Sequence, residues 1–185
     1  MYQTLLKNII LLLSFLYIVS PPANAQNVKW LSWEEAMELS KTEKRKILID
    51  VYTDWCGWCK QMEKVTFNST AVAGYLNENY YPVKFDAESK KTLSYNGKEY
   101  KYIKRGRNGY HELAAELLRG KLSFPTVVFL DENSKMIQPI PGFQDANTFK
   151  MIMKYFAEDH FKDTPWPKYT REFQKAIVPQ PVKNP

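Results

Sequence analysis

Residues 47–60 read ILIDVYTDWCGWCK, and this stretch decides the fold class. Its first part, 47–52, is a nearly continuous run of apolar β-forming residues, which is typical of a central strand covered on both faces. Its second part holds Cys56 and Cys59 in a C-x-x-C spacing. We expect a helix to start at these cysteines, so the stretch predicts a buried strand followed by a helix that carries both thiols in its first turn.

A cysteine pair at a helix N-terminus has a definite chemical use. The first turn leaves backbone N–H groups unpaired and carries the partial positive charge of the helix dipole. A thiolate at Cys56 is stabilised there, so its pKa falls and it can attack a disulfide near neutral pH. Cys59 lies one turn later on the same face, where it can attack the mixed disulfide and release the partner. The spacing therefore predicts Cys56 as the nucleophile and Cys59 as the resolving thiol.

The chain has 185 residues, and these two cysteines are the only ones in it. A bridge between them closes a very short loop, so it constrains little of the unfolded chain. Stability is therefore a poor reason for the pair, and reactivity is the better one.

The first 25 residues have the order of features of a secretory signal peptide. A positive charge precedes an apolar run at 9–19, and Ala23 and Ala25 form a small-x-small cleavage site after two prolines. The run is too short to span a bilayer comfortably. We expect an exported, periplasmic protein of the bacterial cell envelope with no stable membrane anchor, whose mature chain starts near Gln26. An uncleaved membrane anchor is the alternative.

The composition is that of an ordinary globular domain. Hydrophobic residues make up 44% and charged residues 25% of the chain, which argues against disorder. The net charge of +6 comes from dispersed Lys and Arg residues, apart from a short basic stretch at 101–107. A nucleic-acid site needs a denser basic face. We therefore interpret the charge as a solvated surface and expect no nucleic acid partner.

Helix and strand signals alternate along the rest of the chain. A capping box, Ser32 with Glu35, predicts a first helix, and Asn96-Gly97 predicts a two-residue hairpin. The patterns predict helices at 33–44, 56–65, 72–76, 108–118 (capped by Asn108) and after the cap Asp145, and strands at 47–52, 83–86, 126–130 and 135–140. This alternation predicts an α/β fold with a mixed sheet.

The cysteine motif and a second segment together resemble the thioredoxin superfamily. The second segment is 123–129, which reads SFPTVVF. The resemblance covers about residues 30–160 and is strongest to exported bacterial thioredoxin-like proteins with a Trp-Cys-Gly-Trp-Cys-Lys active site. It implies a thioredoxin fold, with a central mixed β-sheet flanked by helices and a cis-proline that faces the cysteines.

The resemblance also implies roles for four residues outside the motif. Asp50 matches the buried acid that accepts the proton of the resolving cysteine, and Lys84 matches the lysine that pairs with that acid. Pro125 matches the cis-proline, and Phe124 before it would offer its backbone to an extended substrate by strand addition. A purely structural role does not explain Asp50, because burying an unpaired carboxylate destabilises the folded state. The alternative to the implied role of Lys84 is an ordinary surface lysine. The alternative for Pro125 is an ordinary proline in a turn.

The residues next to the two thiols are predicted to contact the substrate. Trp55 and Trp58 can form an apolar surface around the cysteines, although Trp55 has the alternative of belonging partly to the core. Ordinary thioredoxins have Gly-Pro between their cysteines, where this chain has Gly57 and Trp58. No metal is expected, because the spacing of the cysteines from the two histidines, His111 and His160, fits no zinc pattern. No cofactor is expected either.

The sequence divides into three parts. Residues 1–25 are the predicted signal peptide, 26–163 the thioredoxin-like domain, and 164–185 a Pro-rich C-terminal tail with a short helix near 169–176. An insertion at about 88–120, which contains the hairpin, lengthens the chain before the cis-proline. It either shapes the choice of partner or is a surface decoration.

Together these features predict an exported protein thiol–disulfide oxidoreductase whose partners are disulfides and dithiols of other proteins. We expect mainly a reductant, because Gly57 and Trp58 supply no charge that stabilises a thiolate and Asp54 adds negative charge. Such a reductant needs a membrane-spanning electron donor. The alternatives are a chaperone or binding module with a non-catalytic disulfide, a disulfide-donating oxidase, and a metal- or copper-delivery protein.

Overall fold

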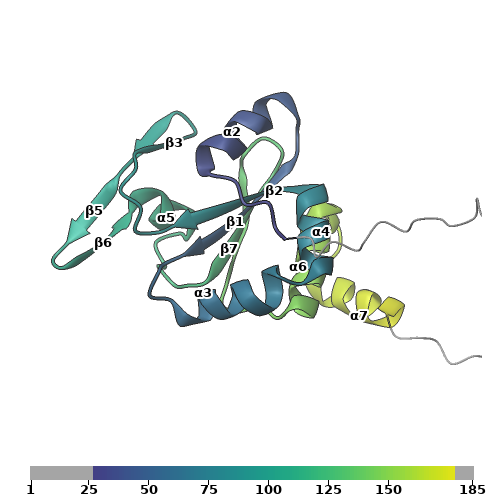
Figure 1. The fold of residues 1–185 in the computed structure, drawn as a ribbon. Coiled ribbons are helices and arrows are strands. Elements are labelled where there is room, and N and C mark those ends of the chain that lie inside the picture. The colour runs from purple at the N-terminus through teal and green to yellow at the C-terminus, as the bar shows by residue number, and fades with distance from the viewer. Residues whose placement is uncertain (1–26, 178–185) are drawn as a thin grey trace, which may run out of the picture.

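The computed structural model describes residues 27–177, which form a mixed sheet covered by helices (Figure 1). The four central strands lie in the order β2-β1-β7-β8. Their bounds are β1 (Lys46–Tyr52), β2 (Tyr80–Asp86), β7 (Thr126–Leu130) and β8 (Met136–Pro141). β1 pairs in parallel with β2 and antiparallel with β7, and β7 pairs antiparallel with β8. The expected α/β fold with a central mixed sheet is confirmed.

Different helices cover the two faces of the sheet. Neighbouring residues of β1 point to opposite faces, so Ile47 and Ile49 join one hydrophobic core and Leu48 joins the other. The first core includes residues of α2 and α5, and the second includes residues of α4 and α6. These helices are α2 (Trp33–Thr42), α4 (Thr70–Asn79), α5 (Glu112–Leu117) and α6 (Ala146–Ala157). β1 is buried along most of its length, which confirms it as a central strand.

The helix predicted at the cysteines consists of three pieces. These are α3 (Gly57–Met62), the π-helical segment η1 (Glu63–Phe67) and α4. The interruption between the helices predicted at 56–65 and 72–76 is confirmed, with Ser69 as the N-cap residue of α4. The sequence analysis did not predict the π-helical turn, which widens the helix directly after the cysteines.

Strand β2 begins earlier than predicted, so Pro82 lies inside the strand rather than before it. A proline inside a sheet is tolerated on an edge strand when its missing N–H faces outward. β2 is such an edge, and the Pro82 carbonyl accepts a hydrogen bond from the Leu31 N–H at 2.8 Å on the side away from β1. The ladder between β1 and β2 therefore loses no hydrogen bond at Pro82.

The insertion before Pro125 contains two hairpins that extend from the sheet beside α5 (Figure 1). The first joins β3 (Leu93–Tyr95) to β4 (Lys98–Tyr100) through the predicted Asn96-Gly97 turn, and the second joins β5 (Tyr102–Arg105) to β6 (Asn108–His111). The prediction that Asn108 caps a helix is wrong. Gly106 takes the positive φ, 58°, that the second turn requires, and Asn108 pairs with Arg105. His111 caps α5 instead.

The C-terminal part packs against the domain. Asp145 caps α6 as predicted. The tail then forms η2 (His160–Lys162) and α7 (Trp166–Ile177), a longer helix than the one expected near 169–176. Tyr169 of α7 is buried in the second core. The domain boundary at 163 stays a prediction.

The predicted signal peptide at 1–25 lies outside the described residues, as do residues 178–185. In the part from 27 to 177, no helix has both the length and the apolar character needed to cross a membrane.

Candidate active site

The cysteine pair lies where β1 ends and α3 begins, as the sequence predicts. Cys56 is the N-cap residue of α3, and the Cys59 backbone N–H donates to the Cys56 Sγ at 3.0 Å. The two cysteines are bonded to each other and are only 5% and 6% exposed, so the structure describes the oxidised state. An N–H group of the first helical turn thus faces the Cys56 sulfur, a contact that stabilises a thiolate once the disulfide is reduced.

Two exposed tryptophans flank the disulfide. Trp55 is 67% exposed and its ring lies 5.9 Å from that of Phe124, while Trp58 is 63% exposed and its ring lies 5.5 Å from that of Phe143. The alternative that Trp55 belongs to the core does not hold. Gly57 between them has open space where a side chain would be. Large exposed aromatic surface of this kind is typical of a site that contacts a partner.

Phe124 and Pro125 lie beside this surface, at the start of β7. Their peptide bond is cis, as expected for a cis-proline in this position. The Pro125 carbonyl accepts a hydrogen bond from the Gly142 N–H at 2.8 Å. Within residues 27–177, the N–H and C=O of Phe124 have no backbone partner. These free groups, next to Trp55, are the ones that strand addition by an extended chain requires.

Asp50 of β1 and Lys84 of β2 form an ion pair across the parallel ladder. The two residues are direct partners in the register, and Lys84 Nζ lies 3.0 Å from Asp50 Oδ2. Asp50 is 2% exposed, and its Oδ1 has no hydrogen-bond partner among the described residues. Burial raises the pKa of Asp50 to about 6, although the charge of Lys84 acts in the opposite direction. The alternative of a simple surface lysine does not hold.

Lys84 is held tightly in place. Its ammonium group lies 4.9 Å from the ring centre of Trp30 and 5.2 Å from that of Tyr52, which are cation–π contacts. Burial by itself would lower the pKa of Lys84, but the carboxylates of Asp50 and Glu63 outweigh it and the pKa is raised. Lys84 is therefore a fixed positive charge next to Asp50 at neutral pH.

Glu63 completes this network and was not predicted. Its carboxylate contacts Lys84 Nζ, and it opens the π-helical segment η1. Glu63 also lines a pocket of about 350 Å³ together with Cys59 and Lys84, so solvent has a path to the resolving cysteine. The signal in the sequence is the spacing: Glu63 follows Cys59 by four residues, which places both on one side of a helix.

Lys84→Met and Glu63→Gln are expected to move the pKa of Asp50 in opposite directions. Lys84→Met removes a positive charge that lowers this pKa, so the value rises above about 6. Glu63→Gln removes a negative charge that raises the pKa of Asp50, and Lys84 then pairs with Asp50 alone. The pKa of Asp50 should therefore fall below about 6. NMR titration of the Asp50 carboxyl carbon in the oxidised protein measures both shifts.

The matched control is Lys64→Met, which removes an exposed lysine next to Glu63 that belongs to no ion pair in the described residues. It should leave the Asp50 titration unchanged. Shifts of the same sign in Lys84→Met and Glu63→Gln would contradict the network described above.

The two histidines lie apart from the cysteines in separate local contacts. His111 is fully buried at the start of α5, where its Nδ1 accepts from the Leu113 N–H. The ring of His160 lies 4.9 Å from that of Tyr169, near the C-terminal helix. Over residues 27–177, no three His, Cys, Asp or Glu side chains gather closely enough to hold a metal ion.

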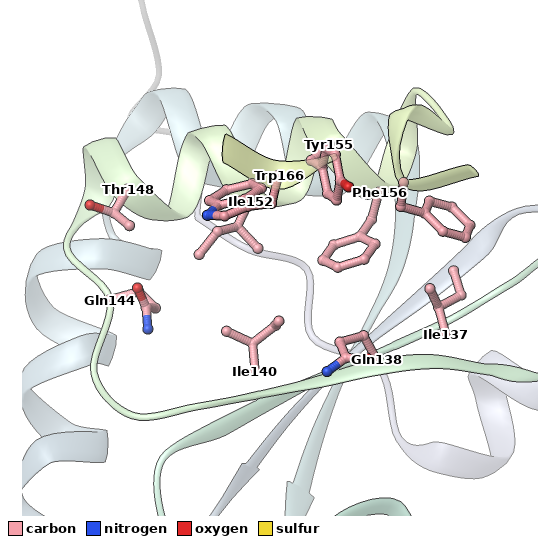
Figure 2. A pocket seen from close by; sticks show the side chains of 10 residues that line it. Ile137, Gln138, Ile140, Gln144, Thr148, Ile152, Tyr155, Phe156 and Trp166 are labelled. Atoms are coloured by element: carbon pink, nitrogen blue, oxygen red, sulfur yellow. The ribbon is translucent and has the colours of Figure 1, made fainter. Parts of the chain in front are cut away.

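A larger cavity of about 570 Å³ lies between β8 and α6 (Figure 2). Ile140 and Gln138 of β8 face Ile152 of α6 and Trp166 of α7 across it, and its lining is mostly apolar. None of the predicted site residues lines this cavity. The groups suited to thiol chemistry are therefore those around the disulfide.

Comparisons with known proteins agree with this site. The family described as the thioredoxin-like domain matches residues 33–157. The thiol:disulfide interchange protein DsbD of Actinobacillus pleuropneumoniae is 28% identical over 114 residues, which is 60% of this chain and 16% of DsbD. DsbD of Vibrio vulnificus is 40% identical over 45 residues, 24% of this chain and 8% of that protein. The chain thus matches less than a fifth of the length of these two relatives.

Solved structures show the same fold. A structure described as DsbH Oxidoreductase has a TM-score of 0.53 at 21% identity and covers 74% of this chain and 89% of its own. A thioredoxin-fold protein from Helicobacter pylori has a TM-score of 0.52 at 17% identity, with coverages of 71% and 81%. The family match spans the cysteine motif, the central sheet and the cis-proline together. This chain therefore belongs to the thioredoxin-like domain family, and it carries the cysteine pair of a thiol–disulfide oxidoreductase.

Proposed function

We propose that this chain is an exported protein thiol–disulfide oxidoreductase that reduces disulfides of other proteins through Cys56 and Cys59. The observation that carries the proposal is the arrangement around the disulfide. Its first sulfur lies at a helix start, and the ring of the preceding Trp55 contacts Phe124, whose backbone is free. A buried carboxyl with a raised pKa lies in the strand that leads to this helix. Relatives named thiol:disulfide interchange proteins support protein disulfides as the substrate class.

The proposed reaction has two displacement steps. In the reduced protein the Cys56 thiolate attacks one sulfur of a substrate disulfide, that bond breaks, and the other substrate sulfur leaves as a thiolate that takes up a proton. Cys59 then gives its proton to the Asp50 carboxylate and attacks the Cys56 sulfur. The second substrate sulfur leaves, and the protein retains a Cys56–Cys59 disulfide. The substrate gains two electrons, which the protein has lost.

Asp50 suits the second step because of its pKa. A general base works best when its pKa lies near the working pH, and burial raises the pKa of Asp50 to about 6. The free Oδ1 is available to receive a proton, while Oδ2 stays bound to Lys84. The pocket shared by Cys59, Lys84 and Glu63 gives that proton an exit to solvent. In this proposal Lys84 and Glu63 position and tune Asp50 rather than contact the substrate.

We assign the reducing direction from the weakly stabilising surroundings of Cys56. Strong oxidants of this superfamily owe their potential to a highly stabilised thiolate. Here Gly57 and Trp58 bring no charge, and no acidic or basic residue other than Lys60 lies in the first turns of α3. A reductant outside the cytoplasm has no access to the glutathione pool, so we further propose a membrane-spanning electron donor.

Equilibration with glutathione buffers is expected to give a reduction potential nearer −270 mV than −120 mV, the values of thioredoxin and of a strong oxidant. The fraction of disulfide in each buffer is read by mass spectrometry after acid quenching and alkylation. A potential near −120 mV would reverse the assigned direction and make the chain a disulfide donor.

Export should remove residues 1–25, because Ala23 and Ala25 supply the small residues that the signal peptidase requires. N-terminal sequencing of protein from the cell envelope is expected to start at Gln26. A retained Met1 would indicate an anchored form instead.

Insulin reduction tests the proposed function as a whole. With dithiothreitol as the electron source, the exported protein should speed the precipitation of the insulin B chain. The chaperone alternative predicts that the protein slows this precipitation and that the slowing survives replacement of both cysteines by serine.

A further inference from the structure

A groove leads from the active site to the second hairpin of the insertion. It has a volume of about 230 Å³. Its lining includes Thr53, Trp55 and Phe124 at the active-site end and Arg105, Gly109 and Tyr110 at the hairpin end. We propose that this groove binds an extended segment of the substrate protein that follows its reactive cysteine and carries acidic side chains a few residues away from it. The inference rests on the proposed function and adds to it a substrate preference set by the β5–β6 hairpin.

The first argument is that both ends of the groove offer backbone hydrogen-bonding groups. β6 pairs only with β5 in the described residues. The His111 N–H donates to the Ala87 carbonyl at 2.6 Å, on the side away from β5. Backbone groups two residues apart in a strand point to the same side, so Gly109 directs its N–H and C=O toward that outer edge. At the active-site end Phe124 has its own free backbone groups, so an extended chain finds partners at both ends.

The second argument is a buried hydroxyl without a partner. Thr53 is 1% exposed and lines the groove, and its Oγ1 has no hydrogen-bond partner in the described residues. Buried polar groups in folded proteins are nearly always hydrogen-bonded. Thr53 also lines the pocket beside Cys59 and lies two residues from Trp55 and three from Cys56, so a bound segment that supplied the missing partner would lie next to the reactive sulfur.

The third argument is the positive charge of the second hairpin, whose Arg105 lines the groove. Residues 101–107 hold four basic side chains and no acidic one. Lys104, Arg105 and Arg107 are exposed, and none of them has an ion-pair partner within residues 27–177. Exposed cations without an ion-pair partner remain available to carboxylates of a bound segment.

The active-site end carries the opposite charge. Glu88 lines the groove, and the pKa of Asp86 is raised by burial and by the negative charges of Asp54 and Glu88, against the Glu88 backbone N–H and the charge of Lys90, which lower it. Acidic side chains of a substrate are therefore disfavoured next to its cysteine and favoured toward the hairpin tip. The preferred segment is neutral or basic beside the cysteine and acidic a few residues away.

The test uses two fluorescence-quenched disulfide peptides that differ only in flanking charge, one with glutamates away from the cysteine and one with lysines. Pre-reduced exported protein is mixed with each, and the second-order rate constant is measured. The wild-type protein should reduce the acidic peptide about 10-fold faster, a typical size for steering by a few charges. At 1 M salt, where the Debye length is about 3 Å, the two rates should converge.

The variant that tests the hairpin is Lys104→Glu with Arg105→Glu and Arg107→Glu, and it should invert the preference. A milder variant, with Gln at the same positions, should abolish the preference, and circular dichroism checks that each variant is folded. The matched control changes three exposed basic residues of α7, Lys168, Arg171 and Lys175, to Glu, and it should keep the wild-type preference.

Equal rates for both peptides in the wild-type protein would overturn this inference while leaving the proposed function intact. An equal loss of preference in the α7 control would also overturn it, because net charge alone would then explain the result. Failure to reduce either peptide would count against the proposed function itself.

Discussion

Cys56→Ser is expected to abolish insulin reduction by this protein and to leave only the rate of dithiothreitol alone. The first step needs a thiolate that attacks the substrate disulfide, and a serine hydroxyl is not ionised near neutral pH. No other thiol can take its place, because Cys59 is the only other cysteine of the chain and lies within the first turn of α3 rather than at its N-cap position. Loss of a catalytic nucleophile costs more than about 1,000-fold in rate. The turbidity assay detects a loss of that size directly.

Cys59→Ser provides the matched comparison, because it removes the same atom from the other thiol. Cys56 still attacks, but no resolving thiol follows, so a mixed disulfide with insulin accumulates. Mass spectrometry after acid quenching should find this adduct in Cys59→Ser and not in Cys56→Ser. Adducts on Cys59 in Cys56→Ser, with turnover retained, would exchange the roles of the two cysteines. Unchanged activity in both variants would favour the binding-module alternative.

The central part of the site could be predicted because its signals are local in the sequence. The apolar run of β1 and the cysteine spacing that follows it determine one strand and the start of one helix, and both lie within 47–60. The Ser32 capping box and the Asp145 cap are equally local, and both are confirmed. Lys84 is different, because its contact with Asp50 depends on the register of two strands far apart in the chain. Only the family resemblance identified it.

The features that sequence analysis missed have sequence patterns that fit more than one local structure, so the pattern alone does not choose between them. Glu63 reaches Lys84 from a π-helical segment, and no sequence rule separates such a turn from an ordinary helix. Asn108 is an acceptable helix cap and also an acceptable first residue after a two-residue turn. In the structure Asn108 pairs with Arg105 across the turn that contains Gly106, so this segment forms the hairpin. That hairpin brings Gly109 and Arg105 into the groove next to Trp55.

Asp50→Asn is expected to slow disulfide exchange about 100-fold at pH 7 while making the folded protein more stable. The loss of rate is the contribution of a positioned general base, because the amide of asparagine cannot accept the Cys59 proton. Single-turnover reduction of a peptide disulfide, followed by mass spectrometry, should show that formation of the mixed disulfide is little changed. Its resolution by Cys59 should be the slow step.

The gain in stability follows from the raised pKa. Burial raises the pKa of Asp50 from 3.8 to about 6 in the folded protein, so between these values the folded state binds more protons than the unfolded state. The free energy of unfolding therefore decreases as the pH rises through this window, by about 3 kcal/mol in all. Below pH 3.8 the carboxyl is neutral in both states and has no such effect. An asparagine at position 50 stays neutral at every pH, so the Asp50→Asn protein does not lose this stability as the pH rises.

Urea unfolding of the oxidised proteins at pH 4 and pH 7 measures this difference. Asp50→Asn should gain about 2–3 kcal/mol over the wild-type protein at pH 7 and much less at pH 4. Asp54→Asn is the control, since it removes an equal charge from an exposed position near the cysteines, and its effect should stay within about 0.5 kcal/mol. If Asp50 only stabilised the fold, Asp50→Asn would lower the free energy of unfolding. If Asp50 behaved like a surface residue, the substitution would change neither the rate of disulfide exchange nor the stability. In Asp50→Asn, slower resolution of the mixed disulfide together with a larger free energy of unfolding is expected only if two conditions hold. The reaction requires the Asp50 carboxyl, and its burial lowers the stability of the folded protein.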